Sequence, residues 1–242
     1  MKAHIAQWIG RRKKQEDYYV VRSYSNGVLA VVCDGMGGHS YGALSAHRAA
    51  EEFVVAFEER PDGSVAERLR WALDDANEAV AAVGERTGAF GGTTLLAAFV
   101  GAGVLWWASV GDSPLFLWRN NRLVRLNADH SMRAIYRDFV QSGAMTHAEA
   151  MSRGHELRSA LTGDALPMVD VPPTPYPLLP GDRIILATDG TDDLLQQPSL
   201  SPETRLLLND RSAPLASLLV DACRRLEKEW ADNTTVVTVD IE

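Results

Sequence analysis

The chain has 242 residues, which is enough for a sizeable buried core, and we expect one domain over residues 1–242. Hydrophobic residues make up 46% of it and charged residues 23%, as is typical of a globular protein. The formal net charge of -8 argues against non-specific binding to nucleic acid or to an anionic membrane, because both need a basic surface. An excess of carboxylates suits a protein that binds cations instead.

The sequence carries no sign of secretion or membrane insertion. Its two cysteines, Cys33 and Cys223, are far apart and in no metal-binding spacing, which favours buried thiols in a reducing compartment. The N-terminal segment MKAHIAQWIGRRKK lacks the apolar core of a signal peptide. The longest apolar stretch, residues 95–110, is interrupted by Gly101-Ala102-Gly103, which favours a turn between two strands over a membrane span. We therefore expect a cytoplasmic protein.

The expected elements alternate between groups of strands and pairs of helices. Helical spacing of apolar residues predicts helices over residues 46–57, 65–83, 132–143 and 214–230. Asn120-Asn121 predicts a tight hairpin. Strands are expected over residues 5–9, 18–24, 28–33, 93–100, 104–110, 115–118, 123–126, 183–187 and 234–241. Adjacent hairpins with paired helices indicate an α+β fold of antiparallel sheets covered by helices.

Acidic residues stand at the ends of several apolar runs. Asp34 ends the run VLAVVC, Asp112 follows LWWASVG, and Asp189 ends RIILAT. Glu16-Asp17 and Asp232-Asn233 directly precede expected strands. A carboxylate at the edge of a buried strand is costly unless it is hydrogen-bonded, paired or bound to a cation.

The sequence offers no matching set of arginine or lysine residues at strand ends. Oxygen-binding hard cations, Mg²⁺ or Mn²⁺, are therefore the favoured partners of these carboxylates. The absence of histidine and cysteine from the set argues against zinc. Each Asp-Gly pair taken alone is more often a turn, so only the whole set favours a metal centre.

The order of these residues resembles the PPM family, the PP2C-type metal-dependent protein serine/threonine phosphatases, in its compact bacterial form. The matching motifs are Arg12-x-x-x-Glu16-Asp17, Asp34-Gly35-Met36-Gly37-Gly38-His39, Gly92-Thr93-Thr94, Val110-Gly111-Asp112-Ser113, Asp129-His130-Ser131, Thr188-Asp189-Gly190 and Asp232-Asn233-Thr234-Thr235. Each motif alone is weak, whereas the ordered set spans nearly the whole chain. The resemblance implies a phosphatase catalytic domain over residues 1–242, folded as a four-layer sandwich of two antiparallel β-sheets flanked by pairs of α-helices.

The resemblance also implies which residues bind two metal ions, Mn²⁺ or Mg²⁺. Asp34 would bridge them, and the carbonyl of Gly35 would add a ligand. Asp189 and Asp232 would complete the shell of the first ion. Glu16-Asp17 would serve the second, directly or through water.

Further roles follow from the same resemblance. Asp112 with Asp189 would hold a third, weaker ion, and Arg12 would bind the substrate phosphate, although alone it suggests only a solvated base in the run 11–14. Two such cations about 3.5–4 Å apart share a water and lower its pKa, and the hydroxide would attack phosphorus in line. Phosphate and hydroxide repel each other, so the metals and the guanidinium must neutralise charge.

Some positions depart from the family pattern. Gln15 stands where the family usually has asparagine, and Pro114 replaces an arginine. Met36 stands where eukaryotic members often have a histidine proposed as the general acid, which leaves His39 or a metal-bound water as the proton donor. Residues 129–163 resemble the family's flap, where specificity is expected.

Other readings of the motifs are weaker. A haloacid-dehalogenase-type phosphatase would need a nucleophilic aspartate at position 187, which is alanine. Nucleotide binding by the glycine-rich stretch 35–42 lacks the Gly-Lys-Ser/Thr that should follow. An inactive domain that only binds partners is the third alternative. For an active phosphatase the expected partners are phosphorylated proteins, a serine/threonine kinase or its targets, with the chain a monomer.

Overall fold

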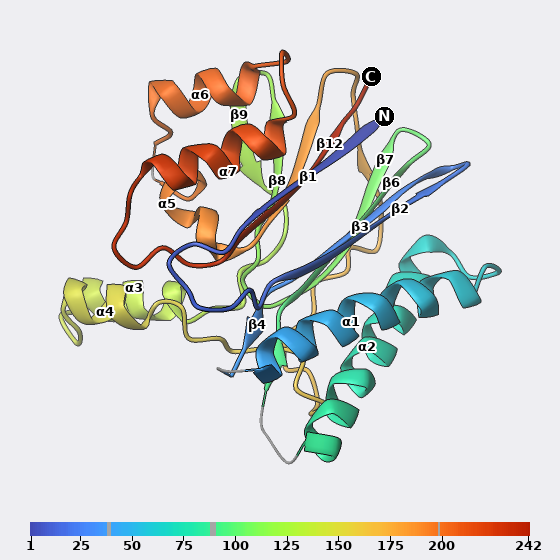
Figure 1. Cartoon of the computed structure of the whole chain (residues 1–242), viewed down its shortest axis with the longest axis horizontal. Coiled ribbons are helices and arrows are strands. Elements are labelled where there is room, and N and C mark those ends of the chain that lie inside the picture. Colours follow the sequence, from blue (N-terminus) through green and yellow to red (C-terminus); the bar gives the residue numbers. More distant parts are fainter. Residues whose placement is uncertain (38–39, 88–90, 198) are drawn as a thin grey trace.

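The computed structural model describes residues 1–37, 40–87, 91–197 and 199–242. Two five-stranded antiparallel sheets pack face to face, and helices cover the outer face of each sheet (Figure 1). The four layers confirm the α+β sandwich expected from the sequence. Among the described residues, no helix combines the length and apolar character that crossing a membrane requires.

The sheets are assembled from strands far apart in the sequence. In order across the first sheet the strands are β1 (Lys2–Trp8), β12 (Thr234–Asp240), β11 (Arg183–Ala187), β8 (Leu115–Arg119) and β9 (Arg122–Arg125). In order across the second they are β10 (Tyr176–Pro177), β7 (Val104–Val110), β6 (Leu95–Gly101), β3 (Gly27–Cys33) and β2 (Tyr18–Tyr24). A short pair, β4 (Gly35–Met36) and β5 (Gly92–Thr93), continues beyond β3.

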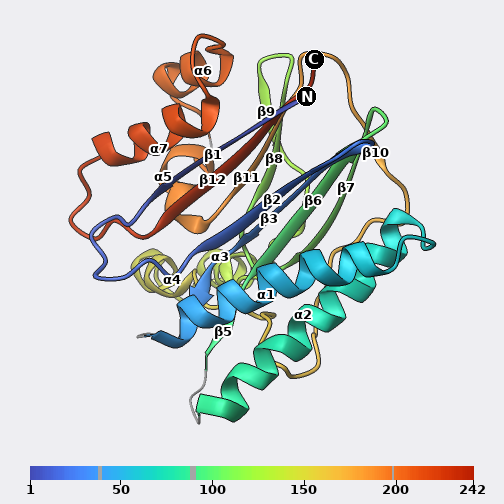
Figure 2. The same ribbon diagram turned by 45° about the vertical axis from the view of Figure 1, so that its right-hand side comes forward.

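The helices form the outer layers. Helices α1 (Ser40–Glu59) and α2 (Val65–Thr87) cover the second sheet, whereas α6 (Pro202–Asn209) and α7 (Leu215–Arg225) lie on the side of the first (Figures 1 and 2). Two short helices, α3 (Arg133–Gln141) and α4 (His147–Arg153), lie together at one end of the sandwich. The 3₁₀ turn η1 (Asp189–Thr191) leads from β11 into α5 (Asp192–Leu195).

The position of β3 between two layers explains why its sequence is apolar without interruption. Every residue of it is buried, because both faces of the second sheet are covered. Leu29, Val31 and Cys33 pack under α1 and α2, whereas Ala30 and Val32 face the other sheet. Successive side chains of β3 thus point alternately into two separate hydrophobic cores.

The observed elements differ from the expected ones mainly at their ends. The first strand begins three residues earlier than expected, at Lys2, and the expected strand 93–100 is divided at Thr94 into β5 and β6. Helix α7 ends at Arg225, well before the expected end at residue 230. Strands β4 and β10 and helices α4, α5 and α6 were not expected. The break at Thr94 turns out to be part of the site.

Candidate metal centre and active site

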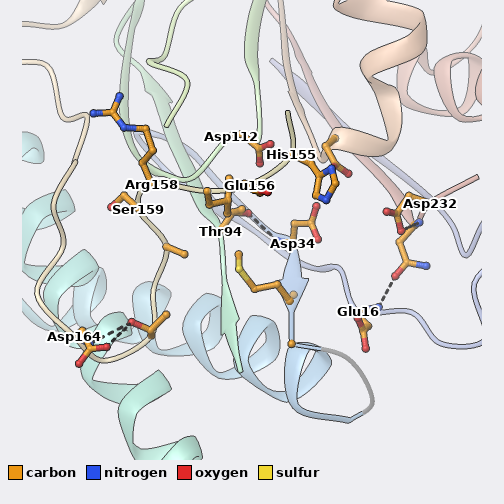
Figure 3. Close-up of a pocket in the computed structure, with 18 of the residues that line it drawn as sticks. Glu16, Asp34, Thr94, Asp112, His155, Glu156, Arg158, Ser159, Asp164 and Asp232 are labelled. Carbon is orange, nitrogen blue, oxygen red and sulfur yellow. Dashed lines mark hydrogen bonds between the residues drawn. The ribbon is translucent and has the colours of Figure 1, made fainter. Parts of the chain in front are cut away.

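Asp34 leaves the end of β3 and is held by threonines from the neighbouring chain segment. Its N–H donates to the Thr94 hydroxyl at 3.0 Å, and its carbonyl accepts from the Thr93 hydroxyl at 2.9 Å. The following residue must be glycine, because a Cβ at Gly35 would lie 2.3 Å from the carbonyl oxygen of Gly42 in α1. These contacts fix the backbone and leave the Asp34 carboxylate directed into a pocket (Figure 3).

Glu16 and Asp17 lie in the turn before β2. The Glu16 N–H donates to the side-chain carbonyl of Asn233 at 2.7 Å, which joins this turn to the start of β12. Asp17 is buried, and its Oδ2 accepts hydrogen bonds from the hydroxyls of Thr235 at 2.7 Å and Thr188 at 3.0 Å. Its Oδ1 is buried without a hydrogen-bond partner. An orphaned carboxylate oxygen at this depth is costly, and a cation would satisfy it.

Asp189 and Asp232 come from adjacent strands of the first sheet. Asp189 follows β11, and Asp232 precedes β12. Asp232 is joined to Arg12 by an ion pair of 2.6 Å. The Arg12 side chain is 58% exposed, so it reaches the centre from solvent and is free to exchange partners.

Asp112 lies in the connection between β7 and β8. Its preceding residue, Gly111, has φ +102° and a Cα hydrogen directed at Thr94, where a Cβ would meet the side chain at 2.6 Å. The Asp112 carboxylate is buried and faces the guanidinium of Arg133 at 3.5 Å. Arg12 and Arg133, neither of them at the end of a strand, thus supply positive charge to Asp232 and Asp112.

A single cavity of about 910 Å³ collects most of the expected site residues (Figure 3). The expected residues that line it are Arg12, Glu16, Asp34, Gly35, Asp112, Asp189 and Asp232. Asp17 is the exception, because it lies beneath the surface of the pocket and contacts the threonines described above. Met36 also lines the pocket, whereas His39 lies outside the described residues.

Burial first, and then neighbouring carboxylates, raise the pKa values of three aspartates of the site. Burial raises the pKa of Asp17 to about 7, although the hydrogen bonds from Thr235 and Thr188 oppose the shift. Burial, then the charges of Asp17 and Asp189, hold the pKa of Asp34 well above its usual range. Burial and neighbouring carboxylates do the same to the pKa of Asp189. The ionised carboxylates are thus unfavourable in this site, and a bound cation would stabilise them.

The donor set fits hard divalent cations. It consists of the carboxylate oxygens that line the pocket and the orphaned oxygen of Asp17 beneath it. In the part of the chain that the structure describes, no three acidic, histidine or cysteine side chains already converge on one point. Ion binding would therefore draw the carboxylates together and give the orphaned Oδ1 of Asp17 a partner.

Other residues at this end of the sandwich were not expected from the sequence. The flap contributes His155, Glu156 and Arg158 to the wall of the pocket, in the segment that follows α4 (Figure 3). Asp192 is partly buried beside Arg133, and burial raises its pKa to about 6. Its position in the run Thr188-Asp189-Gly190-Thr191-Asp192 was the available signal.

Buried His130 gives a pH-dependent stability prediction. Its Nδ1 accepts the Gly111 N–H at 3.2 Å, and burial lowers its pKa below the usual 6.5. Below that pH the unfolded chain binds a proton that the folded chain excludes, so stability is lost as pH falls, by up to about 1.4 kcal/mol per pH unit. His130→Asn keeps an acceptor for Gly111 but does not titrate.

Urea unfolding of the metal-free protein between pH 7.5 and 5 checks this. On acidification the wild type should lose more unfolding free energy than His130→Asn. Taking the difference between the two proteins removes the contribution of the carboxylates, which titrate in both. Parallel pH curves for the two proteins would contradict a neutral, buried His130.

Comparison with known proteins gives the site its context. A model of the protein phosphatase 2C family matches residues 7–233. The serine/threonine phosphatase stp of Listeria welshimeri is 26% identical over 239 residues, which cover 95% of this chain and 91% of the relative. The serine/threonine protein phosphatase PstP of Mycobacterium tuberculosis is 28% identical over 224 residues, and there the alignment covers 90% of this chain but 41% of the relative.

Solved structures agree with the sequence matches. The crystal structure of the catalytic domain of PstP in complex with two manganese ions superposes with a TM-score of 0.76 and 27% identity. The superposition covers 100% of this chain and 98% of that chain. Because the family model spans most of the sequence and the fold agrees throughout, this chain belongs to the protein phosphatase 2C family.

Proposed function

We propose that this chain is a Mn²⁺- or Mg²⁺-dependent protein phosphatase that hydrolyses phosphoserine and phosphothreonine, with residues 1–242 forming one catalytic domain. The observation that carries the proposal is the meeting of strand-end carboxylates with Arg12 in one pocket. These residues come from separate parts of the chain and are the ones by which the chain resembles the family. Their convergence is difficult to explain as a set of independent turns.

The carboxylates would divide the binding of the ions among them. Asp34 would bridge two ions, with Asp189 and Asp232 on one and Glu16-Asp17 on the other. The carbonyl of Gly35 would add a ligand. When bound, the ions would supply an activated water and offset the charge of the phosphate.

Arg12 is proposed to bind the substrate phosphate. It now pairs with Asp232 at 2.6 Å, which puts its guanidinium beside the carboxylates. If Asp232 turns to an ion, Arg12 is released, and its planar donors suit two phosphate oxygens. The exchange would present a positive group to the phosphate on the side of the pocket that faces solvent.

The proposed substrates are phosphorylated proteins. Two named relatives are serine/threonine phosphatases, and the flap residues His155 and Arg158 line the wall of the pocket. We propose further that the protein acts as a cytoplasmic monomer against a serine/threonine kinase or its targets. The net charge of -8 speaks against nucleic acid as a partner.

Metal removal tests the proposed function. Protein treated with EDTA and desalted should release no phosphate from a phosphothreonine peptide, and added Mn²⁺ or Mg²⁺ should restore release, because the carboxylates alone cannot activate water. A phosphotyrosine peptide of the same sequence is the matched control and should turn over much more slowly. No phosphate release with either ion, across fresh preparations, would favour an inactive domain that only binds partners.

A further inference from the structure

The first residue of the flap helix α3, Arg133, lies between two carboxylates of the core. Its Nη2 is 2.5 Å from Asp192 Oδ2 and 3.5 Å from Asp112 Oδ2. A third carboxylate, that of Asp129, lies 3.8 Å from Nη1. Asp192 begins α5 and Asp112 lies between β7 and β8, so one guanidinium joins three separate segments.

The contact is largely shielded from water. The Asp112 residue is 3% exposed, and the Arg133 side chain is 31% exposed. Arg133 Nη1 is buried and has no hydrogen-bond partner. A buried donor left unpaired is unfavourable. The attraction between the guanidinium and the carboxylates therefore holds Arg133 in this position, although its Nη1 makes no hydrogen bond there.

The neighbouring arginine does not replace this contact. Arg125, at the end of β9, donates to the backbone carbonyl of Asp112 at 2.8 Å and to the Asp129 carboxylate at 3.1 Å. Neither bond reaches the Asp112 carboxylate. Two guanidiniums thus stand against the three carboxylates of Asp112, Asp129 and Asp192, and only Arg133 faces the Asp112 side chain in the contacts described above.

A guanidinium and a divalent ion would compete for the same oxygens. Arginine keeps its charge at every accessible pH, so acidification or alkalinisation does not remove it from the competition. Without Arg133, the three carboxylates would face only the guanidinium of Arg125. A divalent ion would neutralise the negative charge that remains. An ion at Asp112 would need Arg133 to leave, and α3 begins at this residue.

We propose that Arg133 is the resident counter-ion of Asp112 and Asp192, that it excludes a further divalent ion from Asp112, and that it anchors the flap helix α3 to the core. The proposal rests on the proposed metal-dependent function, because it concerns how many ions the same pocket holds. Arg133 acts here as a positioning residue through Asp112. In this proposal the guanidinium of Arg133 takes the place of the third, weaker ion that was expected at Asp112.

Counting bound Mn²⁺ tests the proposal without an activity assay. Metal-free protein is titrated with Mn²⁺ while the free ion is measured by its electron paramagnetic resonance signal. Arg133→Gln should bind one more ion per chain than the wild type over the same range. Arg137→Gln removes a charge one helical turn away, from an exposed position of α3, and should bind the wild-type number.

A double variant guards against loss of the fold. Arg133→Gln leaves Asp112 buried without its counter-charge, so the metal-free variant should unfold at a lower temperature than the wild type. Arg133→Gln combined with Asp112→Asn should regain that stability and return to the wild-type ion count. Mn²⁺ should raise the unfolding temperature of Arg133→Gln more than that of the wild type.

Two results separate the possible failures. Equal, non-zero ion counts and affinities in the wild type and in Arg133→Gln would overturn the role of Arg133 while leaving the proposed function intact. No bound Mn²⁺ in the wild type or any variant would overturn the proposed function, and the inference with it.

Discussion

Replacing Asp34 with asparagine is expected to lower phosphate release by at least about a thousandfold while the protein still folds, because the proposed bridge between the ions is lost. Asparagine keeps the size of the side chain and the backbone hydrogen bonds to Thr93 and Thr94. The loss should appear in kcat, and excess Mn²⁺ should not restore it. The measurement is phosphate release from a phosphothreonine peptide over a range of Mn²⁺ concentrations.

The same substitution should stabilise the metal-free protein. The pKa of Asp34 is held well above its usual range by burial and by the carboxylates around it, so its ionised form is unfavourable in the fold at neutral pH. A neutral side chain removes that cost above the ordinary pKa of aspartate. Metal-free Asp34→Asn should therefore unfold at a higher temperature than the wild type and gain less from added Mn²⁺.

A matched control separates the bridge from a general loss of charge. Asp138→Asn makes the same chemical change on the exposed face of α3, away from the pocket. It should leave turnover and the response to Mn²⁺ unchanged. Turnover of Asp34→Asn within a few-fold of that of Asp138→Asn would refute the bridging role.

The sequence was informative about the sandwich because covered strands carry a strong pattern. The strand expected over residues 28–33 is β3, which is buried on both faces and so carries a continuous apolar run. Strand β10 (Tyr176–Pro177) was missed because two residues in a proline-rich stretch have no periodicity to detect. Helix α4 (His147–Arg153) did carry a signal, since Thr146 and Glu149 form a capping box, but its length gives little periodicity.

The strand-end carboxylates could be placed in one site because their order along the chain resembles that of a known family. Asp34, Asp189 and Asp232 each adjoin a long apolar strand, and all three line the pocket. The positive charges could not be placed in the same way. Arg125 and Arg133 reach Asp112 through the packing of β9 and α3, and no local pattern encodes that approach.

A second large effect is expected away from the pocket, at Arg183 on β11. This arginine is 1% exposed, and its guanidinium holds Asp240 of β12 with contacts of 2.6 and 3.3 Å. Its Nη1 also donates to the carbonyls of Leu208 at 3.1 Å and Asp210 at 2.6 Å, where α6 ends. The side chain therefore satisfies the end of a helix and ties it to two strands at once.

Arg183→Leu is expected to destabilise the protein by about 3–5 kcal/mol, because it removes the buried partner of the Asp240 carboxylate and leaves two carbonyls without their donor. That loss should lower the unfolding temperature by roughly 10 °C for a chain of this size. Arg211→Leu is the matched control, since Arg211 contacts the same Asp240 carboxylate at 3.3 Å but from an exposed position. It should cost no more than about 1 kcal/mol.

Urea unfolding of the metal-free proteins, with equal slopes for the wild type and both variants, would measure the two costs. Arg183 lies outside the residues that line the pocket, so phosphate release per folded molecule at low temperature should stay near that of the wild type. The two arginines share one carboxylate, so the gap between their costs measures what the burial of Arg183 and its bonds to the end of α6 add beyond the exposed contacts of Arg211, which include a bond to the Gly181 carbonyl at 2.7 Å. Equal losses for Arg183→Leu and Arg211→Leu would mean that Asp240 alone matters and that the bonds to the end of α6 contribute little.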